Sequence, residues 1–153
     1  MEMKEKENEK DARRVLLSVT GLAKNQEAED EAVHLLTTGT LSGRPDAWRL
    51  DYVETQPDSQ ESAVTLTLGG GVVTMQRRGD FATSMVFEKG CRFEGSYDTP
   101  YGSLDMGVFP TLVRYCVDEE ANGEVKLKYQ LDLQGQFAAM HELRIRFCPA
   151  GKA

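Results

Sequence analysis

Arg77 is the residue whose type and spacing point most directly to chemistry. It continues an alternation of apolar and polar residues in which Val73 and Met75 share one face of an extended strand. If those two apolar side chains face a protein interior, Arg77 faces it as well, whereas Arg78 faces solvent. A guanidinium keeps its proton in a protein and is costly to desolvate alone. Arg77 therefore requires a carboxylate, several neutral acceptors, or an anionic or carbonyl group supplied by a ligand.

The chain offers Arg77 partners of two kinds. At the rim of the interior its side chain could extend toward solvent and pair with Glu88 or Asp80. Further inside, carboxylates and tyrosine hydroxyls are available from Glu88, Glu94, Asp105, Tyr52, Tyr97 and Tyr101. We place Arg77 at the mouth of the interior and expect a natural ligand to direct an anionic or carbonyl group at it. The adaptable and aromatic side chains expected to line this site are Met75, Met85, Phe87, Phe93, Tyr97 and Tyr52. The alternative is that these side chains only fill a closed core.

Motifs for catalysis and metal binding are absent from the sequence. There is no GxSxG motif, and the serines have no histidine placed by spacing to activate them. His34 and His141 show no HxH or HxxxH spacing, so we expect packing or surface roles for both. The pair Glu119-Glu120 lies beside a turn and is expected to be solvated. We therefore predict no catalytic residue, no metal and no cofactor, and the sequence does not support an enzyme.

Glycine and cysteine patterns also exclude classes of function. Gly69-Gly70-Gly71 lacks the GxGxxG spacing of a nucleotide-binding loop and predicts a hairpin connection. Cys91, Cys116 and Cys148 show no CxxC spacing and are odd in number, which favours a reducing compartment and burial as small hydrophobic side chains.

Charge and hydropathy set the remaining limits. The 153 residues carry a formal net charge of −7, which works against a nucleic-acid-binding surface. The first ten residues, MEMKEKENEK, precede no apolar signal segment, and no run of about 18 apolar residues follows, so we expect a cytoplasmic protein without a membrane segment. We divide the chain into a charged, mobile tail at 1–13 and a single domain at 14–149. The sequence does not indicate an oligomeric state.

Short segments of alternating apolar and polar residues, separated by turn residues, predict strands throughout this domain. The segments lie near 14–20, 32–41, 48–52, 63–68, 72–78, 85–87, 91–97, 104–117, 125–133 and 143–147. Pro110 is expected to interrupt or bulge its strand. The turns are expected at 88–90, at 99–102 and at Ala121-Asn122-Gly123, where Asn-Gly is a strong hairpin signal. Polar connections are expected at 21–30 and 56–60.

Eight to ten strands without a helical pattern predict an all-β fold, either a sandwich or a barrel. Short connections between consecutive strands favour an antiparallel up-and-down meander closed into a barrel. Closure requires the strand at Val15–Val19 to pair with the strand at Leu143–Phe147. A stripe of basic residues outside the barrel is expected to be neutralised by neighbouring carboxylates, with an anionic partner as the alternative; it comprises Lys126, Lys128, Arg144 and Arg146.

Four segments, in order along the chain, resemble an uncharacterised bacterial family, the YwiB-like domain of unknown function. They are Met75-x-Arg77-x-Gly79, Met85-x-Phe87-Glu88-x-Gly90, Thr99-Pro100-Tyr101-Gly102 and Tyr129-x-Leu131-Asp132-Leu133-x-Gly135. The resemblance spans about residues 32 to 147 and implies a calycin-like, lipocalin-related β-barrel with no assigned activity. It carries over no catalytic residue. The chain departs from the pattern at its charged tail and at Phe109-Pro110-Thr111.

Three hypotheses about function remain. The first is a barrel that binds a small molecule in or at the mouth of its interior, since a barrel of about eight strands is wide enough for one small ligand. The second is a protein-interaction module that acts through its outer surface. The third is an enzyme of unknown class that uses the barrel mouth.

Overall fold

The computed structural model describes residues 12–24, 31–55 and 61–150. Within these ranges ten strands form one closed antiparallel barrel. The strands are β1 (Arg13–Lys24), β2 (Glu31–Arg44), β3 (Ala47–Thr55), β4 (Glu61–Gly69), β5 (Val72–Arg78), β6 (Ala82–Phe87), β7 (Phe93–Thr99), β8 (Gly102–Val117), β9 (Gly123–Leu133) and β10 (Gln136–Pro149). Residues 1–11 of the expected tail and the expected connections at 25–30 and 56–60 lie outside the described residues.

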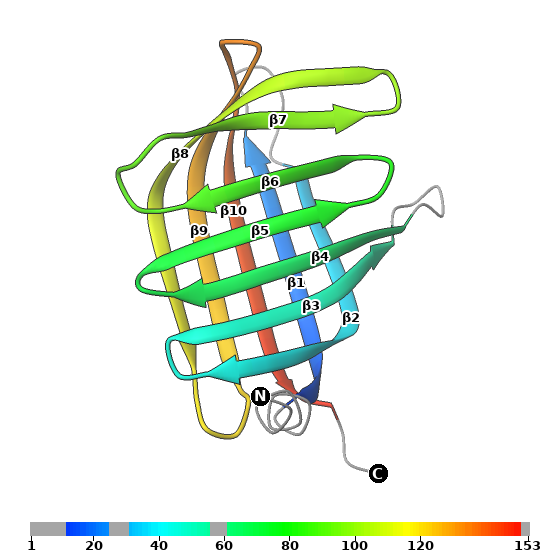
Figure 1. Ribbon diagram of the computed structural model, residues 1–153, viewed down its shortest axis with the longest axis vertical. Helices are drawn as coiled ribbons and strands as arrows, with labels where there is room; N and C mark the ends of the chain where they lie inside the picture. The colour runs from blue at the N-terminus through cyan, green and yellow to red at the C-terminus, as the bar shows by residue number, and fades with distance from the viewer. Residues whose placement is uncertain (1–11, 25–30, 56–60, 151–153) are drawn as a thin grey trace, which may run out of the picture.

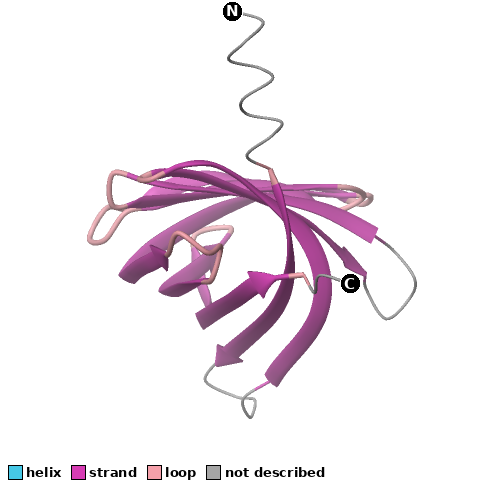
Figure 2. Ribbon diagram, turned by 90° about the horizontal axis from the view of Figure 1, so that it is seen from below, coloured by secondary structure: helices cyan, strands magenta, loops and turns pink. Residues whose placement is uncertain are grey.

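The barrel is a meander in which each strand pairs with its neighbours in sequence, and β1 pairs with β10 to close the wall. Leu17 lies opposite Phe147 and Val19 opposite Ile145, so the predicted closing contact is confirmed. Figure 1 shows β3 to β7 crossing in front of β8, β9, β10, β1 and β2. Viewed from below, strands and loops alone make up the described wall (Figure 2). The described residues include no helix long and apolar enough to cross a membrane.

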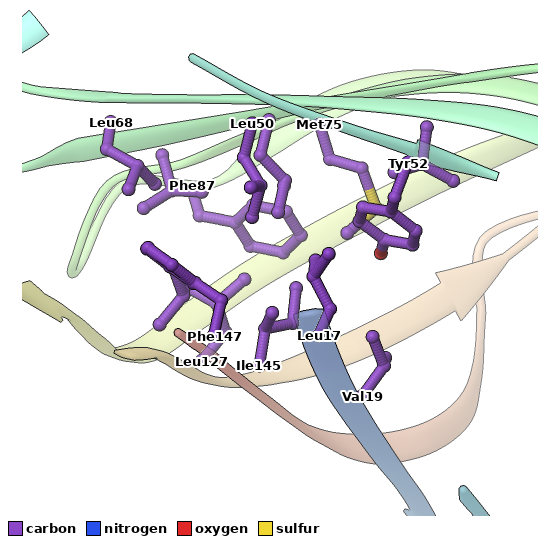
Figure 3. Close-up of a cluster of buried hydrophobic side chains, with 14 of the residues drawn as sticks. Leu17, Val19, Leu50, Tyr52, Leu68, Met75, Phe87, Leu127, Ile145 and Phe147 are labelled. Atoms are coloured by element: carbon purple, nitrogen blue, oxygen red, sulfur yellow. The ribbon is translucent and has the colours of Figure 1, made fainter. Parts of the chain in front are cut away.

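Strand alternation produces the core. Val73 is fully buried and Met75 is 3% exposed, while Arg78 is exposed, so the predicted register of β5 is confirmed. Leucine, isoleucine, valine and aromatic side chains from the two crossing halves of the barrel meet in one cluster. Figure 3 shows Leu68 at one end of this cluster and Tyr52, Met75 and Val19 toward the other. Burial of these apolar surfaces is the main stabilising contribution to the fold.

Most of the expected turns are present. The backbone of Gly70 and Gly71 has φ angles of 61° and 77°, which glycine adopts without steric cost, and these residues join β4 to β5 as a hairpin. The expected irregularity at Pro110 is confirmed by a register shift between Pro110 and Leu112. A β-bulge leaves one residue of a strand unpaired, and proline favours such a site because it has no backbone N–H to donate to the neighbouring strand.

The predicted Asn-Gly turn between β8 and β9 is wrong in its geometry. The connection is a five-residue loop, and the positive φ angle, 68°, belongs to Ala121 and not to Asn122. The carboxylate of Asp118 accepts hydrogen bonds from the backbone N–H groups of Glu120 and Asn122, both at 2.9 Å. These bonds fix the longer loop, and the buried methyl group of Ala121 holds it against the core.

Two other expectations are corrected. The polar connection expected from Gly21 is still strand, since Gly21 pairs with Leu143 on one side and with Val33 on the other. The three cysteines, expected to be buried, are exposed free thiols. Cys116 and Cys148 each adjoin an inward-facing residue, so the strand alternation turns their own side chains outward.

Carboxylates lie beside three of the four residues of the basic stripe, as expected, namely Lys128, Arg144 and Arg146. Lys128 forms an ion pair with Glu142 at 3.0 Å. The carboxylate of Glu124 lies 2.8 Å from Nε of Arg146 and 3.9 Å from Nε of Arg144. Solvent screens exposed pairs of this kind, so they remove repulsion between neighbouring strands more than they add stability.

Candidate functional site

The wall of the barrel opens between β2 and β3. In the part of the chain that the structure describes, these strands pair only from Gly39 to Arg44 of β2, where Gly39 lies opposite Tyr52. Earlier in β2 the hydroxyl of Thr37 donates a hydrogen bond of 3.3 Å to the carbonyl oxygen of Val53. At this point a hydrogen bond from a side chain replaces the backbone hydrogen bonds between β2 and β3. The part of β2 that precedes Thr37 remains paired with β1.

A cavity of about 440 Å³ lies at this opening. Its apolar lining comes from inward-facing positions near the end of the core cluster, namely Val19, Leu35, Met75, Met85 and Leu143. Polar lining is contributed by Glu54, Arg77, Tyr129 and His141. Ligand sites in proteins have volumes of about 300–1,000 Å³ and combine apolar walls with a few convergent polar groups, and this cavity has both properties.

Arg77 lies in the wall of this cavity and forms an ion pair with Glu54. Nη2 of Arg77 is 2.9 Å from Oε2 of Glu54, and the two side chains are 23% and 18% exposed. Strand β4 separates their strands, and its buried Ser62 lies opposite Glu54, while Val64 lies opposite Arg77. The long guanidinium side chain therefore spans a neighbouring strand to reach its partner.

The partners that the sequence suggested for Arg77 are wrong. Glu88 and Asp80 were expected at the rim, and Glu94 and Asp105 further inside, but the carboxylate that Arg77 contacts is that of Glu54. The ion pair also leaves part of the guanidinium unsatisfied. Nε of Arg77 is buried and has no hydrogen-bond partner among the described residues. A buried donor in this state is costly to the folded protein.

Aromatic rings connect the core to the cavity. Phe87 packs against Tyr129 with ring centroids 4.9 Å apart, and Tyr129 stacks on His141 with centroids 5.2 Å apart and planes 12° from parallel. Burial raises the pKa of Tyr129 to about 12 and lowers the pKa of His141 below its usual value of 6.5. Tyr129 is thus a protonated phenol and His141 a neutral imidazole at neutral pH.

Tyr52 is the third aromatic residue near the ion pair. It is 4% exposed, and its pKa is raised, first by burial and then by the charge of Glu54, while Arg77 acts in the opposite direction. The Arg77–Glu54 ion pair thus lies beside neutral aromatic side chains, and the carboxylate of Glu142 and the ring of His34 also border the cavity. Among the described residues no group of three or more histidine, cysteine, aspartate or glutamate side chains is placed to hold a metal ion.

The structure brings some of the proposed site residues together and separates others. Met75, Met85 and Arg77 line the cavity, and Tyr52 is buried in the core. Phe87 is fully buried in the core, where it supports Tyr129. Phe93 and Tyr97 are partly buried against the core and do not line the cavity; Tyr97 packs edge-on against Phe81, 6.2 Å away.

The sequence analysis missed Glu54, Tyr129 and His141 as components of the site. Glu54 was detectable, because it continues the inward alternation of Leu50 and Tyr52. The same alternation runs inward through Tyr129 on β9. His141 lies directly opposite Tyr129, a pairing that depends on the register between β9 and β10. The bulge between Phe137 and Ala139 sets that register, and no sequence signal located it.

The comparisons with known proteins agree with this architecture. Residues 17–145 match the model of a family described as a domain of unknown function, DUF1934. The chain belongs to this family. The crystal structure of the ywiB protein from Bacillus subtilis matches with a TM-score of 0.80, over 92% of this chain and 94% of that chain, at 18% sequence identity. At this identity the match shows the fold alone. No curated protein matches the chain.

Proposed function

We propose that the protein binds a small, largely apolar organic molecule in the cavity between β2 and β3, with an anionic or carbonyl oxygen directed at Arg77. The observation that supports this most is the guanidinium of Arg77 in the wall of a 440 Å³ cavity, where the ion pair with Glu54 engages one of its nitrogens. A cavity of this kind offers apolar contacts and hydrogen-bond donors to a molecule that enters it. A ligand with an apolar body and an oxygen acceptor would use both.

The dimensions and the lining fit a single small ligand. A volume of 440 Å³ equals that of roughly fifteen molecules of liquid water at about 30 Å³ each. The thioether side chains of Met75 and Met85 adapt to ligand shape because they are unbranched and polarizable. The stacked rings of Tyr129 and His141 add a flat aromatic surface to the same cavity. Together these features favour recognition of shape with one fixed polar contact.

Native mass spectrometry of freshly purified protein tests the proposal, because it reports a bound small molecule directly. The wild-type protein is expected to carry additional mass, and Arg77→Leu is expected to lose that mass while remaining folded. Arg78→Leu is a matched control, since Arg78 occupies the next position on β5 and is exposed. Arg78→Leu should keep the ligand. Equal occupancy in both variants would contradict the role assigned to Arg77, and unfolding of Arg77→Leu would mark it as a structural residue only.

A second candidate function is protein interaction through the outer surface. Three large apolar side chains on β1, β2 and β3 point outward, with exposed fractions of 45% for Leu16, 77% for Leu36 and 43% for Val53. A groove of about 350 Å³ next to them is bordered by Arg14 and Arg78 among others. Stable self-association that Leu36→Ser abolishes would support this function, and a strictly monomeric protein would weaken it.

Two finer attributes form part of the same proposal. We place the protein among lipocalin-related barrels, which hold ligands in an antiparallel up-and-down barrel of eight strands, although this barrel has ten. We also place it in the cytoplasm. Free thiols at Cys91, Cys116 and Cys148 support this second attribute, since exposed cysteines persist without oxidation in a reducing compartment.

A further inference from the structure

We infer that the molecule bound in this cavity is electrically neutral and presents an adjacent hydrogen-bond acceptor and donor, as a carboxamide does, to Arg77 and Glu54. This inference rests on the proposed ligand-binding function and narrows its chemical class. It excludes the anionic ligand that an isolated inward-facing arginine would suggest.

The first step concerns net charge. Arg77 and Glu54 are in contact at 2.9 Å, and less than a quarter of either side chain is exposed. A carboxylate that entered the cavity would be attracted by the guanidinium and repelled by Glu54 from similar distances, so the two effects largely cancel. The carboxylate would nevertheless lose its hydration, and a buried ion that gains no compensating charge is strongly disfavoured. A neutral polar group avoids most of that cost.

The second step concerns the other ionisable groups around the cavity. His141 and Tyr129 are uncharged at neutral pH, because burial lowers the pKa of the imidazole and raises that of the phenol. The carboxylate of Glu142, which also borders the cavity, is paired with Lys128 on the outer surface. The ring of His34 is within 3.3 Å of the hydroxyl of Thr20. Tyr129 and His141 add no charge and Lys128 compensates Glu142, so Arg77 and Glu54 set the balance of charge in the cavity.

The third step concerns hydrogen-bonding capacity. A guanidinium carries five N–H donors and a carboxylate accepts at about four positions, and the ion pair joins one nitrogen to one oxygen. Nε of Arg77 is buried, which leaves the terminal nitrogens as the donors within a ligand's reach. The pair therefore presents a donor and an acceptor side by side. A carboxamide matches this arrangement because its carbonyl oxygen accepts from Arg77 while its N–H donates to Glu54.

Two probes of the same shape and different charge test the inference, namely 4-phenylbutanamide and 4-phenylbutanoate. Each is titrated into protein carrying ¹³C-labelled methionine methyl groups, and the methyl resonances are followed by NMR. Met75 and Met85 line the cavity and report binding there. Met106, buried in the core, and Met140, 37% exposed, serve as internal controls because neither lines the cavity. The titration yields the site and the affinity of each probe together.

The amide is expected to bind at least tenfold more tightly than the carboxylate, a difference of about 1.4 kcal/mol. In Glu54→Gln the guanidinium loses its counter-charge, so the preference should reverse in favour of the carboxylate. Arg78→Gln should keep the wild-type preference. Equal or tighter binding of the carboxylate to the wild-type protein would overturn the inference and leave the ligand-binding function intact. Failure of both probes to shift Met75 and Met85 would overturn the inference and the proposed function together.

Discussion

Replacing either member of the Arg77–Glu54 pair is expected to destabilise the barrel, and replacing both is expected to restore most of the loss. Removing one partner of a fully buried ion pair costs about 3–5 kcal/mol, because an uncompensated charge remains in the interior. The side chains here are 23% and 18% exposed, so water screens part of the effect. We expect Glu54→Leu or Arg77→Leu to lower the free energy of unfolding by about 2–3 kcal/mol.

A loss of that size corresponds to a fall in Tm of about 5–10 °C for a chain of this length. The double variant Glu54→Leu with Arg77→Leu should lie within about 1 kcal/mol of wild type, since apolar replacement of a buried pair is close to neutral. Urea unfolding of the four proteins gives the coupling energy directly. Arg78→Leu, on the exposed face of β5, should change stability by less than about 0.5 kcal/mol. Additive losses in the double variant would refute the assignment of a buried ion pair.

Three further predictions concern pH, close packing and the thiols. Because burial lowers the pKa of His141 in the folded protein, the unfolded chain takes up a proton at higher pH than the folded protein does. The stability contributed by neutral His141 is therefore complete above pH 6.5 and is lost as the pH falls below that value. In His141→Phe the free energy of unfolding should depend less on pH below 6.5. Gly39→Ala should lower the free energy of unfolding by about 1–3 kcal/mol, because its Cβ would clash with the carbonyl oxygen of Asp51; an unchanged denaturation midpoint would contradict this. Cys91, Cys116 and Cys148 should all react with a thiol reagent in the folded protein, and a protected thiol would show that its exposure is wrong.

Strand alternation made the fold predictable to a large extent. Alternation located the strands, and short connections between them favoured a closed meander in which the first and last strands pair; Leu17 does lie opposite Phe147. The same alternation on β5 placed Arg77 inside with Met75. A period of two residues determines which face a side chain occupies, and one buried face is sufficient to specify it.

The contacts within the site depend on the register between strands, which the alternation of apolar and polar residues does not reveal. Arg77 meets Glu54 across β4 because the register of three strands places both near the cavity and because Ser62 is small. Register of this kind follows from strand tilt and stagger around the whole barrel. The cysteines are the opposite case, because alternation alone predicts that Cys116 and Cys148 are exposed. Their neighbours Tyr115 and Phe147 face inward. The general tendency of cysteine to be buried was the wrong guide there.

The most direct test of the ligand-binding cavity is to fill it without disturbing its walls. Gly21 lines the cavity, and a Cβ added there would meet no atom within 4 Å, so Gly21→Leu should fold with unchanged thermal stability and occupy the ligand's space. Native mass spectrometry of the two proteins should show a bound small molecule on the wild type and none on Gly21→Leu. The same additional mass on both proteins, or on neither, would contradict the account.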